Sequence, residues 1–231
     1  MNDLGRGRRA TAAPTDVRGE REAVKERCVV VGAAPLESDR VLGQIDPARD
    51  YVICADGGID HLRRVGLTPD LLMGDLDSAS NPMEGVEVVA FDPVKDDTDT
   101  HIALKRGLAL GYRDFLLLGC TGGRLDHTLA NLQSLYFLKR QGADGCLLDD
   151  RHRIFFLWEE EREILREDYR YLSFFAYGGE AAGVTLQGVK YPLHEHLLTP
   201  DFPLGVSNEI TGKSCKAAVK KGSLLAVLAR E

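Results

Sequence analysis

Between residues 28 and 150 the chain alternates short apolar runs with amphipathic segments, and this alternation limits the fold more than any other feature. Short, continuous apolar runs have the length of buried strands rather than of helices. Buried strands that alternate with helices are typical of a parallel sheet covered on both faces. The expected strands are residues 28–31, 51–55, 71–73, 86–91, 115–118 and 146–148.

Two of the intervening segments, residues 98–110 and 126–140, have a helical pattern. In and directly before the second segment, four apolar residues follow the i, i+4, i+7 spacing of one helix face. They are Leu125, Leu129, Leu132 and Tyr136. Together with the strands, these helices predict a Rossmann-like α/β domain over residues 28–150.

The pattern changes after residue 150, where short β-rich runs are separated by Gly and Pro. A charged segment at 159–168 is the only further candidate for a long helix, and its Glu-rich start is typical of a solvated face. This spacing predicts an antiparallel β-sandwich or roll over residues 151–231. The expected strands are residues 154–158, 171–177, 182–186 and 224–228.

Residues 1–27 contain no aromatic side chain and almost no apolar periodicity, so we expect a flexible tail. A mitochondrial presequence is disfavoured because this segment contains five acidic residues. We find neither a signal peptide pattern nor an apolar run long enough to span a membrane, and therefore expect a cytoplasmic protein.

The distribution of charge excludes one class of partner and points to a site. The net charge is −7, and no Lys/Arg cluster offers a surface for nucleic acid. Residues 54–100 alone contain eleven acidic and three basic side chains. The acidity is therefore concentrated in one part of the expected α/β domain.

Aspartates follow three successive expected strands. Asp56 follows the second strand, Asp75 and Asp77 follow the third, and Asp96 and Asp99 come between the fourth strand and the next helix. Ligands bind beyond the carboxyl ends of parallel strands, so these carboxylates are expected to converge. Mg²⁺, which prefers carboxylate, water and phosphate oxygens, would relieve their repulsion. Taken singly, each Asp also fits a helix N-cap or a solvated loop, and Asp99 fits a cap that still faces the site.

Two glycine-containing segments belong to the same expected edge. Gly57 and Gly58 follow Asp56 and fit either a tight turn over the pocket or a plain loop. Residues 119–127 (GCTGGRLDH) follow a strand and precede a helix, where backbone amides bind anions. Within this segment, Arg124 supplies planar donors suited to phosphate. His127 fits either a pocket residue or a helix-start residue packed against the loop.

Five motifs, in this order, resemble those of thiamine pyrophosphokinases of the bacterial type. They are ADGG (55–58), TPDLLMGDLDS (68–78), KDDTD (95–99), TGGRLDHTLAN (121–131) and SNE (207–209). The resemblance implies an α/β catalytic domain at 28–150 and a β-sandwich thiamine-binding domain at 151–231. It further implies a homodimer with sites between subunits, and Mg²⁺-dependent transfer of pyrophosphate from ATP to thiamine, giving thiamine diphosphate and AMP.

The resemblance also assigns roles to individual residues. The catalytic residues are Asp75, Asp77, Asp96 and Asp99, and the metal ligands are Asp75, Asp77 and Asp99. The nucleotide-binding residues are Asp56, Gly57, Gly58, Thr121, Gly122, Gly123 and Arg124. The substrate-binding residues are Asp126, His127, Asn131, Ser207 and Asn208. A carboxylate that does not bind the metal would take the proton of the thiamine hydroxyl, and which one does so stays open.

Alternatives remain at this stage. The same fold could transfer pyrophosphate to another alcohol, such as a pterin, or the protein could be a non-catalytic sensor of nucleotides or thiamine phosphates. The full set of carboxylates disfavours a sensor. Ser207 and Asn208 also fit a plain turn. Animal members of the family place a Trp after the SNE motif, whereas the only Trp here is Trp158.

Overall fold

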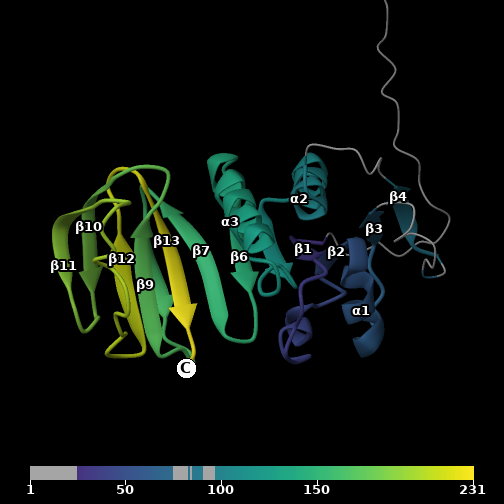
Figure 1. Cartoon of the computed structure of the whole chain (residues 1–231), viewed down its shortest axis with the longest axis horizontal. Helices are drawn as coiled ribbons and strands as arrows, with labels where there is room; N and C mark the ends of the chain where they lie inside the picture. Colours follow the sequence, from purple (N-terminus) through teal and green to yellow (C-terminus); the bar gives the residue numbers. More distant parts are fainter. Residues whose placement is uncertain (1–24, 75–82, 84, 91–96) are drawn as a thin grey trace, which may run out of the picture.

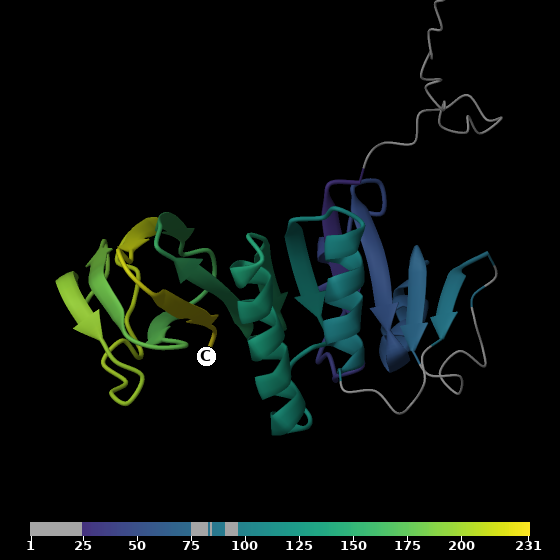
Figure 2. The ribbon, with the colours of Figure 1, turned by 90° about the horizontal axis from the view of Figure 1, so that it is seen from above.

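The computed structural model of the chain describes residues 25–74, 83, 85–90 and 97–231. A long first β-sheet carries helices at one end, and a second β-sheet packs against its other end (Figures 1 and 2). The first sheet has nine strands in the order β4-β3-β2-β1-β5-β6-β7-β13-β9, and the second has four in the order β11-β10-β12-β8. The expected α/β fold followed by a β-sandwich is confirmed.

Six strands, from β4 to β6 in the sheet order, run parallel. Their bounds are β1 Arg27–Val31, β2 Asp50–Ala55, β3 Leu71–Gly74, β4 Glu87–Ala90, β5 Asp114–Leu118 and β6 Asp144–Leu148. The strand order reverses between β1 and β5, because β1 pairs with β2 on one side and with β5 on the other. Such a switch point opens a crevice at the carboxyl ends of the strands.

Helices cover both faces of this parallel part. One face packs against α2 (Asp99–Ala109) and α3 (Leu125–Arg140), and the other against α1 (Ile59–Val65) and the short helix η1 (Leu42–Gln44). Alternate strand residues serve the two cores: Val30 and Leu117 face α2 and α3, while Val31 and Leu118 face α1 and η1. Burial on both faces explains the continuous apolar runs in the sequence.

Antiparallel strands continue the first sheet and form the second. The strands β7 (His152–Trp158), β13 (Ser223–Ala229) and β9 (Tyr171–Ala176) extend the first sheet beyond β6. The second sheet contains β8 Glu161–Leu165, β10 Ala181–Gln187, β11 Leu193–Leu198 and β12 Ser214–Ala218. The two layers share one apolar core. Residues after 151 therefore contribute to both sheets, and the β6–β7 turn joins the two parts of the molecule.

One expectation from the sequence is wrong in part and another is wrong. Of the four residues expected on the apolar face of the second helix, Leu132 and Tyr136 pack against the core, but Leu125 and Leu129 are 72% and 54% exposed. The residues that α3 buries fully are offset from these two around the helix. Two of the residues that it buries, Asn131 and Ser134, are polar, which concealed the true inner face. The charged segment 159–168 contains strand β8 rather than a helix.

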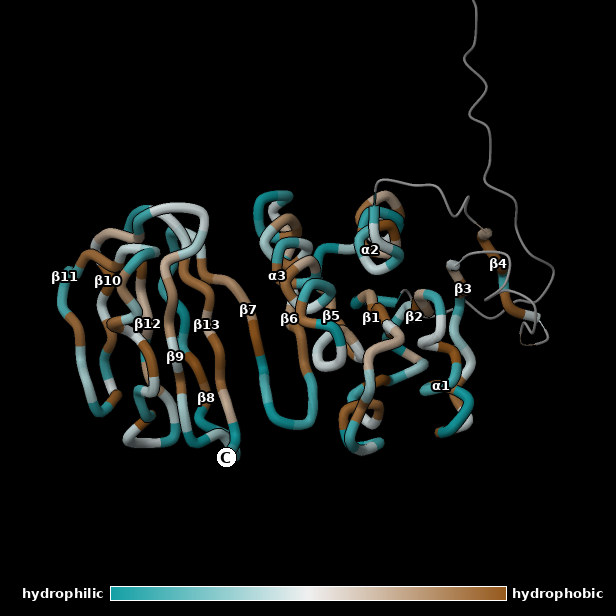
Figure 3. The backbone as a smooth tube through the Cα atoms, viewed as in Figure 1, coloured by the Kyte–Doolittle hydropathy of each residue, from teal (hydrophilic) through white to brown (hydrophobic). Residues whose placement is uncertain are grey.

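Hydropathy follows the layers. In Figure 3 much of β6, β7 and β13 is brown, whereas the turn between β6 and β7 is teal. Within the part of the chain that the structure describes, no helix has the length and apolar character needed to cross a membrane.

Candidate active site

A cavity of about 390 Å³ opens at the switch point, beyond the carboxyl ends of β1, β2 and β5. The starts of α2 and α3 close its other sides. Seven residues expected from the sequence line this cavity: Asp56, Asp99, Gly122, Gly123, Arg124, His127 and Asn131. The fold thus brings together side chains that lie up to 75 positions apart in the chain.

Two aspartates reach this cavity from different elements. Asp56 directly follows β2 and has a φ of +51°, which is unusual for a residue other than glycine. Asp99 is the first residue of α2, but it is not the N-cap. That role belongs to Thr98, whose side chain accepts a hydrogen bond from the backbone N–H of His101. Asp99 is therefore not needed to cap the helix.

Asp75, Asp77 and Asp96, which the sequence predicts to be catalytic, lie outside the described residues. In the sequence Asp75 follows Gly74. Gly74 is the last residue of β3 and lies at the carboxyl end of the parallel strands. Among the described residues, no three His, Cys, Asp or Glu side chains lie close enough together to hold a metal ion. The carboxylates of Asp56 and Asp99 at one cavity nevertheless suit a hard cation such as Mg²⁺.

Close backbone packing explains Gly58. A Cβ atom at this position would lie 2.2 Å from the carbonyl oxygen of Val31 at the end of β1. At Gly57 a Cβ would meet only the side chain of Ala33, at 3.3 Å. Both glycines belong to the short helix η2 (Asp56–Gly58), and neither lines the cavity. Gly58 lets this turn sit directly on β1.

The glycine-rich loop after β5 lines the same cavity as Asp56. Gly122 and Gly123 have φ angles of +79° and +65°, a region that glycine occupies without strain. Arg124 follows as the N-cap of α3, and its guanidinium donates to the carboxylate of Asp126 at 2.5 and 3.1 Å. This pairing holds the pKa of Asp126 below its usual range. A phosphate that binds Arg124 must therefore compete with Asp126.

Asn131 and His127 contribute in different ways. The side-chain amide of Asn131 is buried and donates a 2.8 Å hydrogen bond to the carbonyl oxygen of Cys120. It thereby ties α3 to the loop. His127 lies exposed in the first turn of α3 and lines the cavity.

Ser207 and Asn208 do not line this cavity in a single chain. They lie beside β9, where the N–H of Ser207 donates to the hydroxyl of Ser173. The side chain of Asn208 is buried and binds the backbone of Tyr191 and Glu209. Asn208 therefore has the contacts of a structural turn residue.

Sequence reasoning missed Asp149 and His152 in the β6–β7 turn. The Thr121 hydroxyl donates to Asp149 at 2.5 Å, and the ring Nδ1 of His152 lies 3.1 Å from both carboxylate oxygens. Burial by itself would raise the pKa of Asp149, but hydrogen bonds from His152, Thr121 and the Arg151 amide lower it to about 2. No local motif marks this contact, because Thr121 and Asp149 are 28 positions apart.

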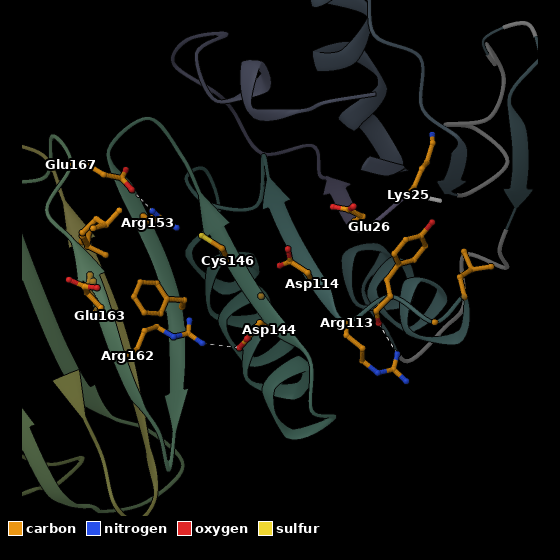
Figure 4. A pocket seen from close by; sticks show the side chains of 18 residues that line it. Lys25, Glu26, Arg113, Asp114, Asp144, Cys146, Arg153, Arg162, Glu163 and Glu167 are labelled. Carbon is orange, nitrogen blue, oxygen red and sulfur yellow. Dashed lines mark hydrogen bonds and ion pairs between the residues drawn. The ribbon is translucent and has the colours of Figure 1, made fainter. Parts of the chain in front are cut away.

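A larger cavity, of about 920 Å³, lies at the opposite edge, where β5 and β6 begin (Figure 4). Arg153 pairs there with Glu167, and Arg162 pairs with Asp144. Parallel sheets bind ligands at their carboxyl ends, and none of the residues expected from the sequence lines this larger cavity. The smaller cavity is therefore the better candidate for the active site.

Comparisons with known proteins identify a family. The family model "Thiamin pyrophosphokinase, catalytic domain" matches residues 43–147, and "Thiamin pyrophosphokinase, vitamin B1 binding domain" matches residues 161–224. The thiamine pyrophosphokinase of Bacillus subtilis (strain 168) is 31% identical over 182 residues, which cover 76% of this chain and 85% of the relative.

Solved structures of two such proteins have the same fold. The crystal structure of the Bacillus subtilis thiamine pyrophosphokinase matches with a TM-score of 0.80 at 29% identity, covering 90% of this chain and 100% of the other. The thiamin pyrophosphokinase of Geobacillus thermodenitrificans matches with a TM-score of 0.79 at 26% identity, covering 89% and 98%. The similarity therefore extends over both sheets.

Proposed function

The chain belongs to the thiamin pyrophosphokinase family, and we propose that it transfers pyrophosphate from ATP to the hydroxyl group of thiamine, giving thiamine diphosphate and AMP. The observation that carries this proposal is the cavity at the switch point. There a glycine loop and the N-terminus of α3 face two aspartates. Such an arrangement suits a polyphosphate whose charge is shared between backbone amides and a cation.

The glycine loop would bind the ATP phosphates. The side chain of Arg124, the N-cap of α3, does not cap the amides of the first turn. The amide of His127 donates to the Asp126 carboxylate at 3.0 Å, and the other amides of this turn suit an anion. Arg124 would exchange the Asp126 carboxylate for a phosphate, replacing one charge-assisted hydrogen bond with another. Asn131 would keep the loop in place through the Cys120 carbonyl. These contacts position the polyphosphate for attack by a hydroxyl group.

Asp75, Asp77 and Asp99 would hold Mg²⁺, with Asp56 and Asp96 beside them. When bound, Mg²⁺ would neutralise the phosphate charge that grows as AMP departs. The protein's own contribution is to hold the carboxylates of Asp56 and Asp99 at one cavity before the reaction begins, so that these two groups need little rearrangement. A carboxylate that does not bind the metal would accept the proton of the thiamine hydroxyl.

We propose further that the protein works as a homodimer with sites between subunits. Leu125 and Leu129 leave apolar side chains of α3 exposed near the glycine loop. Helices of globular proteins normally bury such apolar side chains against the core. Exposed apolar side chains also precede Ser207, at Phe202, Leu204 and Val206. Packing of these two patches between copies would bring Ser207 of one chain toward the cavity of the other.

One assay tests the proposed reaction. The purified protein is incubated with ATP, MgCl₂ and thiamine, and AMP and thiamine diphosphate are separated by chromatography. We expect the two products in equal amounts, and none when EDTA is added. AMP formed only when a pterin alcohol replaces thiamine would instead identify a different acceptor. Tight binding of nucleotide without any AMP would point to a sensor.

A further inference from the structure

The β6–β7 turn, residues 149–152, contacts the glycine loop of the candidate site. Four donors converge on the carboxylate of Asp149. They are the Thr121 hydroxyl at 2.5 Å, the amides of Arg151 and His152 at 2.8 and 2.6 Å, and the His152 ring at 3.1 Å. Only 17% of the Asp149 side chain is exposed. This carboxylate is therefore fixed in position before any ligand binds.

The same turn is fastened to the loop after β1 and to the last strand. The carboxylate of Asp150 accepts hydrogen bonds from the amides of Glu37 and Ser38 at 2.8 and 3.1 Å, close to Pro35 in the cavity wall. Arg230, directly after β13, donates to the backbone oxygen of Asp150 at 2.7 Å. The turn thus has contacts on three sides and provides a rigid support for Thr121.

The glycine loop itself has little intrinsic rigidity. Gly122 and Gly123 carry no side chain that could hold their positive φ angles, and glycine loses more entropy than other residues when it is ordered. Their order must come from the flanking residues. On one side Asn131 holds the carbonyl of Cys120, and next to the glycines Asp149 holds the hydroxyl of Thr121.

We propose that Asp149 is a positioning residue of the pyrophosphate-transfer site, which acts through the Thr121 hydroxyl to hold residues 121–124 in the shape that binds the ATP phosphates. This inference rests on the proposed function. Asp149 does not line the cavity that contains Asp56 and Asp99. With Thr121 it lines a neighbouring cavity of about 500 Å³ that shares Gly122 and Gly123 with the candidate site, so it would act through the loop. Its effect would be specific to the nucleotide rather than to thiamine.

Paired substitutions at Thr121 test this role. Thr121→Val removes the hydroxyl with little change of shape, while Thr121→Ser keeps it. We expect Thr121→Val to raise KM for ATP about tenfold, because a hydrogen bond to a charged group is lost. KM for thiamine should stay within about twofold, and Thr121→Ser should restore KM for ATP. A fall in kcat with both KM values unchanged would indicate a purely structural role and overturn the proposal.

A matched control exists in the second sheet. Ser214 donates a 2.5 Å hydrogen bond to Glu163, which equals the Thr121 contact in type and length but lies away from the cavity. Ser214→Ala should leave KM for ATP unchanged. An equal rise in KM for ATP in this control would show that the loss of any such bond has the same effect, and would contradict the proposal.

A double-mutant cycle shows whether Asp149 acts through Thr121. If it does, the variant with both Asp149→Ala and Thr121→Val should have the same KM for ATP as Asp149→Ala alone. Independent, multiplicative effects would refute the link. If Asp149→Ala does not fold, as judged by circular dichroism, the Thr121 pair alone decides.

The proposed function and this inference can fail separately. If the wild type does not act on thiamine, binding of MgATP is measured by calorimetry for the wild type, Thr121→Val and Thr121→Ser. Weaker binding in Thr121→Val alone would support the positioning role even though the proposed acceptor is wrong. Equal binding by all three proteins would overturn it.

Discussion

Gly32 and Gly119 meet where β1 and β5 end, and their backbones touch. A Cβ atom on Gly32 would lie 2.6 Å from the carbonyl oxygen of Gly119, and one on Gly119 would lie 2.4 Å from that of Gly32. The N–H of Ala34 also donates to the Gly119 carbonyl at 2.9 Å. This crossing fixes the floor of the candidate site, because Gly119 itself lines the cavity.

Gly119→Ala should destabilise the protein by about 2 kcal/mol or more, since it combines a positive φ of +61° with a backbone clash. The matched control is Gly142→Ala. Gly142 has a φ of +70° and nothing within 4 Å of a Cβ, so its cost should be about 1 kcal/mol. Urea unfolding followed by circular dichroism measures both. Equal losses in the two variants would contradict the importance of the Gly32–Gly119 contact.

Asp99→Asn should lower kcat about 100-fold or more, because the site would lose one charged group that stabilises the transition state. Helix α2 should persist, since Thr98 supplies its N-cap. Asp97→Asn is the control: Asp97 pairs with Lys105 at 2.5 Å on the surface and does not line the cavity. Its kcat should stay within about threefold of the wild type. Steady-state kinetics would contradict the assignment if both variants behaved alike.

The pH dependence of stability should reveal the ion pair of His152. The hydrogen bond to Asp149 raises the pKa of His152, and the negative charge of Glu37 raises it further. Burial and the positive charge of Arg151 lower this pKa, but by less. A raised folded pKa means that the stabilisation is complete below about pH 6 and is lost as the pH rises through the folded value. Asp149, with a pKa of about 2, remains charged over this range.

His152→Gln should therefore lower the free energy of unfolding more at about pH 5.5 than at about pH 8.5. Urea denaturation of the wild type and the variant at both pH values measures this difference. If the difference in free energy of unfolding between the two proteins is the same at both pH values, protonation of His152 contributes nothing to stability.

Much of the fold could be predicted because local patterns determine it. The apolar runs predicted all six parallel strands, and the helical pattern of residues 98–110 predicted α2. By contrast, α3 buries Asn131 and Ser134 for contacts that no local pattern encodes, since Ser134 binds His101 and Asn131 binds Cys120. Strand β8, at the edge of the second sheet, was missed because its first three residues are charged and only Ile164 is buried.

In the candidate site, too, residues in local patterns could be predicted, whereas residues that depend on contacts distant in the sequence could not. Asp56 follows a strand, and Asp99 and Arg124 lie where the next helices begin. They could be found because the topology brings strand ends and the following helix starts to one edge. Asp149 could not be found, because its partner Thr121 is distant in sequence and the contact depends on how the β6–β7 turn folds. Ser207 could be recognised only from a motif, since a single chain does not place it at the cavity.

Leu129→Glu should convert the proposed homodimer into monomers and reduce activity. The Leu129 side chain is 54% exposed in the single chain, so a charge there should cost the monomer little stability but would be buried at an interface. Leu165, 57% exposed on β8, provides the control Leu165→Glu, which should remain dimeric. Light scattering after size-exclusion chromatography measures the mass. Monomeric wild type, or dimeric Leu129→Glu, would refute this interface.

Subunit complementation tests whether one site uses both copies. Asp99→Asn removes a carboxylate from the cavity, and Ser207→Arg places a positive charge where the thiamine cation would bind, on an exposed position that tolerates it. If Ser207 of one chain serves the cavity of the other, a hybrid dimer has one site with both defects and one with neither. Mixing the two inactive variants should then restore about a quarter of wild-type activity, since half of the dimers are hybrids with one intact site. If each site were built within one chain, every site in the mixture would retain a defect, and no activity would return.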